Sequence, residues 1–186
     1  IFSLGIIAAA AGSLFNTKKH TGYRSTYILN RVQLITKGIT RELEEVKYKI
    51  EVTYGESLYQ RYGITGIRGE VEAGFPTVIK YALPIFNSLM EEGKYHINDI
   101  LVHTLLYLIA NTEDSNILGR HGLEDLEYVQ NQAKGAIKLG GYLTSGGKKA
   151  VKEMDRDFIK RNISPGGAAD LLAVTIVIYY LENAWI

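Results

Sequence analysis

Three stretches of the chain place glycine, arginine and carboxylate residues close together, which suits the binding of a phosphorylated substrate. The first stretch is 62–76, where four glycines surround Arg68, Glu70 and Glu72. Glycine permits unusual backbone angles and lets a ligand approach closely. On an extended backbone Glu70 and Glu72 could share a divalent cation, whereas on a helix side chains at i and i+2 diverge. The alternative is a solvated turn with an ion pair between Arg68 and a glutamate.

The second stretch, 111–122, crowds polar groups at the end of an apolar segment. It includes Glu113, Asp114 and Asn116. Magnesium is bound by a few carboxylates together with waters and substrate phosphates. This composition suits a magnesium site, but the stretch by itself favours the alternative, a polar loop with Asn111 capping the end of a helix.

The third stretch lies near the end of the chain and gives the strongest signal. Ser164 or a neighbour is expected to cap a final helix, whose first amides are left unobstructed by Gly166 and Gly167. Free amides and the helix dipole together attract phosphate, and Arg161 could add a forked donor. Asp170 then stands at the mouth of an apolar helix, where a buried carboxylate requires a cation or a partner. The alternative is that Asp170 pairs with Arg161 or caps another helix.

Helical periodicity dominates the rest of the chain. Apolar residues recur at steps of three and four, and no run alternates with period two. Residues 174–178 have a strand-like composition, but the length of the surrounding segment and its Ser-Pro entry favour a helix. We therefore expect an all-α fold, a compact multi-helix bundle. The expected helices are 28–50 (one long amphipathic helix), 77–92, 97–108, 123–137 (ended by Gly140 and Gly141), 147–161 and 170–181.

The first segment, Ile1 to Phe15, is almost wholly apolar. It lacks the charged leader and cleavage site of a signal peptide, and it is shorter than the about 20 residues that span a bilayer. We expect a buried helix of a larger protein, so that the chain is a fragment. A length of 186 residues fits a single helical domain over 1–186.

Composition limits the possible partners. Lys and Arg number 21 against 20 Asp and Glu, which argues against broad binding of nucleic acid or anionic membranes. The absence of cysteine excludes disulfides and thiolate chemistry and suits a reducing cytoplasm. The four histidines show no paired metal-ligand spacing, and only His121, beside Arg120, draws attention.

The same three stretches, in this order, resemble the family of triphosphoribosyl-dephospho-coenzyme A synthases, known from citrate lyase and malonate decarboxylase gene clusters. The resemblance covers essentially the whole chain, as the C-terminal two-thirds of a larger catalytic domain. The family's N-terminal third, with its Pro-Lys-Pro-Gly and Asn-Thr-His-Lys-Gly segments, is absent. Ala168 stands where the family usually has Ser, and residues 119–122 depart from its Arg-Gly-Gly pattern. The matching motifs are Tyr-Gly-Ile-Thr-Gly-Ile-Arg-Gly-Glu-Val-Glu-Ala-Gly-Phe-Pro at 62–76, Asn-Thr-Glu-Asp-Ser-Asn-Ile-Leu at 111–118, Gly-Leu-Glu at 122–124, Tyr-Val-Gln at 128–130, Asp-Phe-Ile at 157–159 and Ser-Pro-Gly-Gly-Ala-Ala-Asp-Leu-Leu-Ala at 164–173.

The resemblance implies a bacterial, cytoplasmic transferase that binds ATP, magnesium and dephospho-coenzyme A. The 2′-hydroxyl of dephospho-coenzyme A would attack the anomeric carbon of the ATP ribose, and adenine would leave. The product serves the acyl carrier protein of citrate lyase or malonate decarboxylase, which is therefore an indirect partner. No nucleic-acid or membrane partner is expected. The apolar first helix leaves open either a homodimer or a missing intramolecular neighbour.

The resemblance also implies roles for individual residues, without deciding which carboxylate is the base and which binds metal. Two rival hypotheses are a helical magnesium-dependent nucleoside-triphosphate pyrophosphohydrolase and a non-catalytic helical interaction module, and the missing third leaves open whether the chain is active by itself. The implied catalytic residues are Glu70, Asp114 and Asp170; the metal ligands are Glu70, Glu72, Glu113, Asp114 and Asp170; the substrate-binding residues are Arg68, Gly69, Asn116, Arg120, Arg161, Ser164, Gly166 and Gly167.

Overall fold

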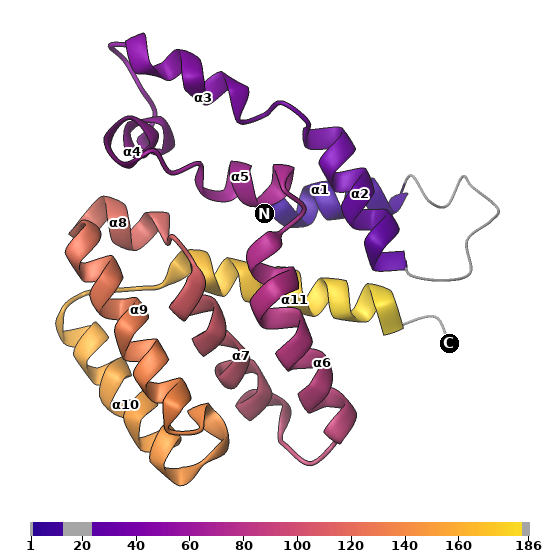
Figure 1. Cartoon of the computed structure of the whole chain (residues 1–186), viewed down its shortest axis with the longest axis vertical. Helices are drawn as coiled ribbons and strands as arrows, with labels where there is room; N and C mark the ends of the chain where they lie inside the picture. The colour runs from indigo at the N-terminus through magenta and orange to yellow at the C-terminus, as the bar shows by residue number, and fades with distance from the viewer. Residues whose placement is uncertain (1, 13–23, 184–186) are drawn as a thin grey trace. The chain divides into compact units, whose positions relative to one another are not determined.

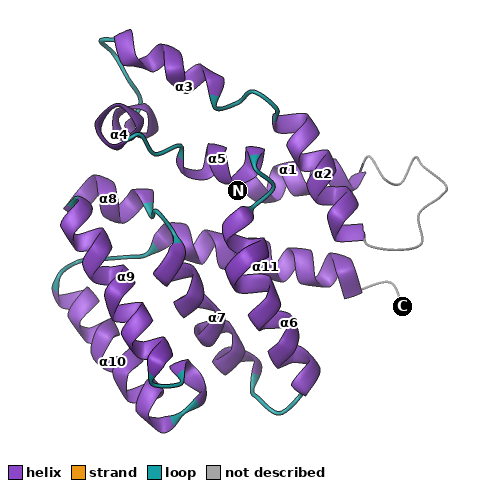
Figure 2. Cartoon of the chain, viewed as in Figure 1, coloured by secondary structure: helices purple, strands orange, loops and turns teal. Residues whose placement is uncertain are grey.

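The computed structural model of the chain describes residues 2–12 and 24–183, and all regular elements among them are helices (Figures 1 and 2). The prediction of an all-α fold is therefore confirmed. The residues divide into two compact units, Ile1–Pro76 with Ile176–Ile186, and Thr77–Thr175. The prediction of a single domain stays a prediction. None of the described helices combines the length and the apolar character that a membrane crossing requires.

The first unit contains short helices and the end of the last helix, α11. Helix α1 buries Ser3, Ile7 and Ala10, whereas Phe2 and Leu4 are 46% and 38% exposed. The described residues thus cover only one side of this helix, which was expected to be buried. The elements are α1 (Phe2–Gly12), α2 (Arg24–Thr36), α3 (Arg41–Glu45), the 3-10 turn η1 (Val46–Tyr48), α4 (Tyr54–Tyr62) and α5 (Gly66–Glu72).

The prediction of one long helix over 28–50 is wrong. The chain breaks between α2 and α3, where Gly38 adopts a φ of +89°, a left-handed conformation that does not continue a helix. The apolar spacing nevertheless persists through the break, since Val32, Leu43 and Val46 are all buried. Periodicity shows which face is buried, but it does not show where the backbone turns.

The second unit forms the larger helical layer. Helix α9 packs against both α7 and α10, and the turn η3 contacts α7, α9 and α10 (Figure 1). The predicted segments 97–108, 123–137 and 147–161 are confirmed as α7, α9 and α10, and 77–92 begins with a π-helical turn. The elements are η2 (π-helix, Val78–Ala82), α6 (Leu83–Glu92), α7 (Ile97–Asn111), α8 (Ser115–His121), α9 (Leu123–Lys138), η3 (Gly141–Leu143), α10 (Ser145–Lys160) and the first part of α11 (Gly166–Asn183).

Two local features of the helices follow from the sequence. Helix α9 ends before Gly140, whose φ of +92° provides the predicted stop. Residues 174–178 lie inside α11, so the helical interpretation of this strand-like run is confirmed. The central helix α7 buries residues on several sides, including Ile100, Leu106 and Leu108, and it therefore forms the core against which the site elements pack.

Candidate functional site

The second and third stretches meet at the carboxylate of Asp114. Its Oδ1 accepts hydrogen bonds from the amides of Asn116 (2.9 Å) and Ile117 (3.4 Å), which open α8. Its Oδ2 accepts from the amide of Ala168 (3.1 Å), in the first turn of α11. One carboxylate thus caps the N-termini of two helices, and both helix dipoles favour its negative charge. The side chain is only 2% exposed, so these amides replace water as its hydrogen-bond donors.

Gly166 and Gly167 permit this close approach. A Cβ built on Gly167 would lie 3.0 Å from the Asp114 carboxylate, and a Cβ on Gly166 would lie 2.9 Å from Nδ2 of Asn116. The Gly-Gly pair therefore has a packing role at the junction. The phosphate contacts expected of these glycines stay predictions, although the Ala168 amide already has an anionic acceptor.

Asp170 is exposed on α11, so the expectation that its carboxylate is buried is wrong. Asp170 lies two residues after Ala168, whose amide donates to Asp114. Its expected roles in catalysis or metal binding do not depend on burial, and an exposed carboxylate can reach a substrate without a desolvation penalty.

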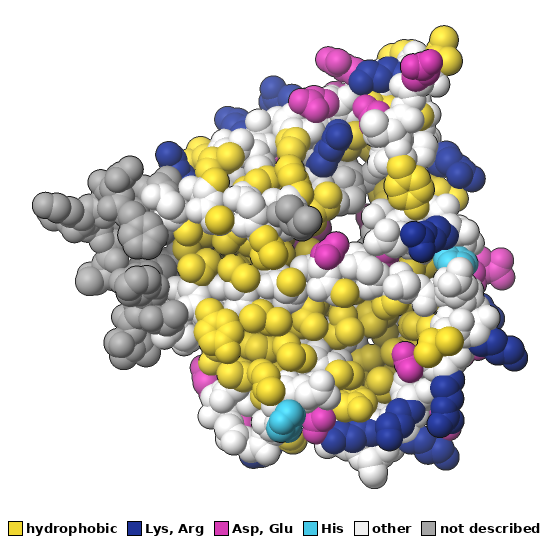
Figure 3. Space-filling view, turned by 180° about the vertical axis from the view of Figure 1, so that it is seen from behind, with side chains coloured by type: hydrophobic (Ala, Val, Ile, Leu, Met, Phe, Trp, Pro, Cys, Tyr) yellow, Lys and Arg dark blue, Asp and Glu magenta, His cyan; other side chains and the backbone are white. Residues whose placement is uncertain are grey.

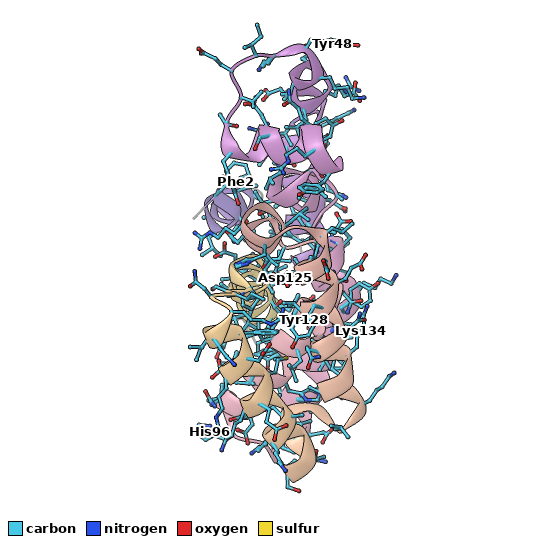
Figure 4. All side chains as sticks on the ribbon, turned by 90° about the vertical axis from the view of Figure 1, so that its left-hand side faces the viewer. Phe2, Tyr48, His96, Asp125, Tyr128 and Lys134 are labelled. Atoms are coloured by element: carbon cyan, nitrogen blue, oxygen red, sulfur yellow. The ribbon has the colours of Figure 1, made fainter. Side chains whose placement is uncertain are left out.

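Arg161 contacts carboxylates of α9 and α10. Its Nη1 lies 3.0 Å from Asp125, its Nε lies 3.3 Å from Asp157, and its guanidinium carbon lies 4.2 Å from the centre of the Tyr128 ring. The Tyr128 hydroxyl donates to Asp157 at 2.8 Å, and this hydrogen bond, together with desolvation, raises the pKa of Tyr128. Asp125 and Tyr128 project from α9 in Figure 4. The expected role of Arg161 at a phosphate stays a prediction.

Sequence reasoning missed these partners of Arg161. The i, i+4 spacing of Asp157 and Arg161 within one helix was the available signal for one of them. The ion pair with Asp125 spans 36 residues, and no local pattern indicates it.

His121 connects the end of α8 to the loop before α11. Its Nε2 lies 3.1 Å from the carbonyl oxygen of Asn162, and its Nδ1 lies 3.6 Å from the Asp125 carboxylate. Asn162 adopts a φ of +57°, the left-handed conformation in which the chain turns out of α10. The ring of His121 therefore helps to fix the loop that leads into the Gly-Gly pair.

A pocket of about 670 Å³ lies between α7, α10 and this loop. Two of the residues expected to bind substrate, Arg120 and Ser164, line it. Sequence reasoning did not find the other polar members. The lining residues are apolar (Val102, Leu105, Leu106, Ile109, Val151, Met154, Phe158, Ile159, Ile163 and Pro165) or polar (Arg120, Tyr142, Lys152, Asp155, Asn162 and Ser164).

The first stretch belongs to the first unit, where it is helical. Glu70 and Glu72 stand at i and i+2 of α5, so the extended backbone required for a shared cation is not present. Gly69 leaves room for the Thr65 hydroxyl, which would lie 1.9 Å from a Cβ at this position. The substrate contacts expected of Arg68 and Gly69 stay predictions.

Glu72 stabilises the break between α2 and α3. Its carboxylate accepts hydrogen bonds from the amides of Gly38 (2.5 Å) and Thr40 (3.2 Å) and from the Thr40 hydroxyl. The Thr40 hydroxyl and the Gly38 amide lower the pKa of Glu72 below its usual value of 4.5. The folded protein therefore stabilises the charged form of this side chain relative to its neutral form.

We expect Glu72→Gln to lower the melting temperature at neutral pH, because an amide replaces the carboxylate that accepts these hydrogen bonds. A lowered pKa contributes stability that is present above 4.5 and is lost as the pH falls through the lowered value. The difference between variant and wild type should therefore shrink in acid. Thermal unfolding across a pH series measures this effect, with Glu51→Gln at an exposed position as control. A pH-independent difference would contradict the assignment.

The described residues contain no group of three or more His, Cys, Asp or Glu side chains that could hold a metal ion. Asp114 and Glu72 already accept hydrogen bonds within the protein, and Glu113 is exposed beside the junction. These carboxylates do not fit a metal centre built from protein ligands alone.

Comparisons with known proteins agree with the motifs. The sequence model of a family described as CitG, ATP:dephospho-CoA triphosphoribosyl transferase, matches residues 1–186. A probable 2-(5''-triphosphoribosyl)-3'-dephosphocoenzyme-A synthase of Salmonella gallinarum is 40% identical over 176 residues, which are 94% of this chain and 57% of that protein.

Two further relatives have corresponding names. The Klebsiella pneumoniae protein is named 2-(5''-triphosphoribosyl)-3'-dephosphocoenzyme-A synthase, and the Citrobacter koseri protein carries the same name preceded by "probable". The protein of Klebsiella pneumoniae is 38% identical over 175 residues, and that of Citrobacter koseri is 39% identical over 176 residues. Each alignment covers 94% of this chain and 57% of the relative. The chain therefore spans little more than half the length of these relatives. No solved structure matches it.

Proposed function

Since the chain belongs to the ATP:dephospho-CoA triphosphoribosyl transferase family, we propose that the protein transfers the triphosphoribosyl group of ATP to dephospho-coenzyme A. A bond forms between the 2′-oxygen of dephospho-coenzyme A and the anomeric carbon of the ATP ribose. The bond from that carbon to adenine breaks, and the hydroxyl proton finally resides on adenine. The observation that carries the proposal is the match of the family over residues 1–186.

The proposed chemistry needs a proton acceptor and a carboxylate that stabilises an oxocarbenium-like transition state. We assign these roles to Glu70 and Asp170. Asp170 supports the assignment by its exposure, which leaves it accessible to a substrate. Asp114 is better suited to positioning, because both of its oxygens accept amide hydrogens and it is 2% exposed.

We propose that magnesium enters bound to the triphosphate of ATP. Magnesium is commonly held by substrate phosphates, waters and one or two carboxylates, and this mode requires no cluster of protein ligands. Among the expected ligands, Glu113 and Asp170 are exposed and could contact such an ion. When bound, the ion would neutralise charge on the triphosphate.

Further parts of the proposal concern the setting of the reaction. We propose a cytoplasmic enzyme whose product passes to the acyl carrier protein of citrate lyase or malonate decarboxylase. The absence of cysteine suits a reducing compartment. The apolar residues that α1 exposes support a further contact at this helix, with a second copy or with another segment.

The carboxylate assignment predicts the behaviour of Glu70→Gln and Asp170→Asn in the full-length protein. We expect adenine release to fall by about 100-fold or more in each variant, the size of a typical general acid–base contribution. Chromatographic measurement of adenine with ATP and dephospho-coenzyme A present tests this, with Glu127→Gln on an exposed face of α9 as control. Near-normal turnover in both variants would show that the assignment is wrong.

The products of the wild-type protein separate the proposed function from its rivals. A triphosphoribosyl transferase releases adenine only when dephospho-coenzyme A is present. A nucleoside-triphosphate pyrophosphohydrolase releases pyrophosphate without an acceptor, and an interaction module releases neither. Pyrophosphate without adenine would exclude the proposed function.

A further inference from the structure

We propose that the pocket between α7 and α10 binds the pantetheine arm of dephospho-coenzyme A, with the diphosphate at Lys152 and the neighbouring basic side chains of α10. This inference rests on the proposed function, because the reaction requires a second substrate besides ATP. It assigns that substrate to a particular surface of the second unit.

The floor of the pocket suits an uncharged, flexible chain. Helix α7 contributes Val102, Leu105, Leu106 and Ile109, which recur at i, i+3, i+4 and i+7 and therefore form one stripe. Helix α10 contributes an apolar stripe opposite it, which includes the 5% exposed Phe158. A volume of about 670 Å³ lies within the usual range for small-molecule sites.

Positive charge borders this apolar floor. The charged lining residues are Lys152 of α10, Arg120 at the end of α8 and the single acid Asp155. A neighbouring hollow of about 300 Å³ also includes Lys152, together with the basic Lys148, Lys149 and Arg156 and the acid Glu153. In Figure 3 the Lys and Arg side chains gather over α10 beside an apolar area. This arrangement attracts an anionic group to one end of an apolar groove.

The pattern fits dephospho-coenzyme A better than ATP. Dephospho-coenzyme A combines a long uncharged arm with a diphosphate, which matches an apolar floor with basic side chains around Lys152 at one end. ATP has no such arm and would leave the apolar floor unfilled.

The pocket also leads towards the junction. Ser164 and Pro165 form part of its lining and directly precede α11, whose first turn is capped by Asp114. A ligand with its diphosphate at Lys152 would therefore extend its pantetheine arm towards the loop that carries the third motif.

Calorimetric binding to the full-length protein without ATP tests the inference, with dephospho-coenzyme A and 4′-phosphopantetheine as probes. We expect both probes to bind the wild-type protein and to compete with each other. Lys152→Glu and Leu105→Trp should each weaken both probes by about 10-fold or more, because one reverses the charge at a phosphate and the other fills the groove. Lys134→Glu, at an exposed position of α9, should leave both unchanged.

Turnover separates failure of the inference from failure of the proposed function. In an active protein, Lys152→Glu should raise the KM for dephospho-coenzyme A about 10-fold and leave the KM for ATP within about two-fold. Equal effects on both KM values, unchanged binding in both variants, or no binding of 4′-phosphopantetheine to the wild type would overturn the pocket assignment. A wild type that binds both probes but releases no adenine would refute the proposed function alone.

Discussion

Asp114→Ala is expected to lower the melting temperature of the protein by about 10–15 °C. The variant removes the acceptor of three amides, those of Asn116, Ile117 and Ala168. A buried amide without an acceptor costs about 1–3 kcal/mol, and loss of an N-cap costs about 1 kcal/mol. A total loss of about 3–5 kcal/mol corresponds to this shift in a chain of this length. Thermal unfolding followed by circular dichroism measures it.

Two further variants show whether the junction is responsible. Glu113→Ala changes the neighbouring, exposed carboxylate and should shift the melting temperature by no more than about 2 °C, as expected of a surface substitution. Asp114→Asn retains one oxygen but turns an amide donor towards the amides of one of the two helices, so its loss should be intermediate. If Asp114→Ala were as stable as Glu113→Ala, the double cap would not contribute to stability.

The junction also shows how far a sequence can predict such a site. An Asp followed by a helix is a recognisable N-cap, so the contact of Asp114 with the start of α8 was predictable in kind. The contact with Ala168 joins residues 54 apart in the chain, and no local pattern indicates it. The order of the motifs predicted that these stretches belong to one function, and the structure adds that two of them share one carboxylate.

The break between α2 and α3 shows a similar limit. Apolar spacing predicted helix throughout, and the buried face is as expected, but the backbone turns at Gly38. The amides exposed by the turn donate to Glu72, which lies 34 residues from Gly38. A hydrogen bond between distant residues therefore outweighs the local preference of this segment for a continuous helix. The same reason accounts for the ion pair between Arg161 and Asp125, since an arginine pattern alone does not distinguish a phosphate from a carboxylate as its partner.

The second large effect is expected for Gly147→Ala, in the first turn of α10. A Cβ at this position would lie 1.8 Å from the carbonyl oxygen of Gly141 and 2.7 Å from its carbonyl carbon. Gly141 in turn leaves no room for a Cβ, which would lie 2.3 Å from Nδ1 of His103 on α7. Helix α10, turn η3 and helix α7 therefore stack through two glycines, and the backbone of Gly141 must move to admit a methyl group.

We expect Gly147→Ala to destabilise the protein by about 3 kcal/mol or more, at the upper end for an overpacked site, and to lower the melting temperature by about 6–12 °C. Gly146→Ala is the matched control, because the nearest atom to its Cβ is the carbonyl oxygen of Leu139 at 4.0 Å. That variant should be neutral or more stable by up to about 1 kcal/mol, since alanine favours a helix over glycine. Gly147 determines how closely α10 approaches the turn that packs on α7. Gly147→Ala should therefore also weaken 4′-phosphopantetheine binding, measured at a temperature at which the variant is still folded. Equal stability of the two alanine variants would mean that the close approach at Gly141 does not hold α10 in place.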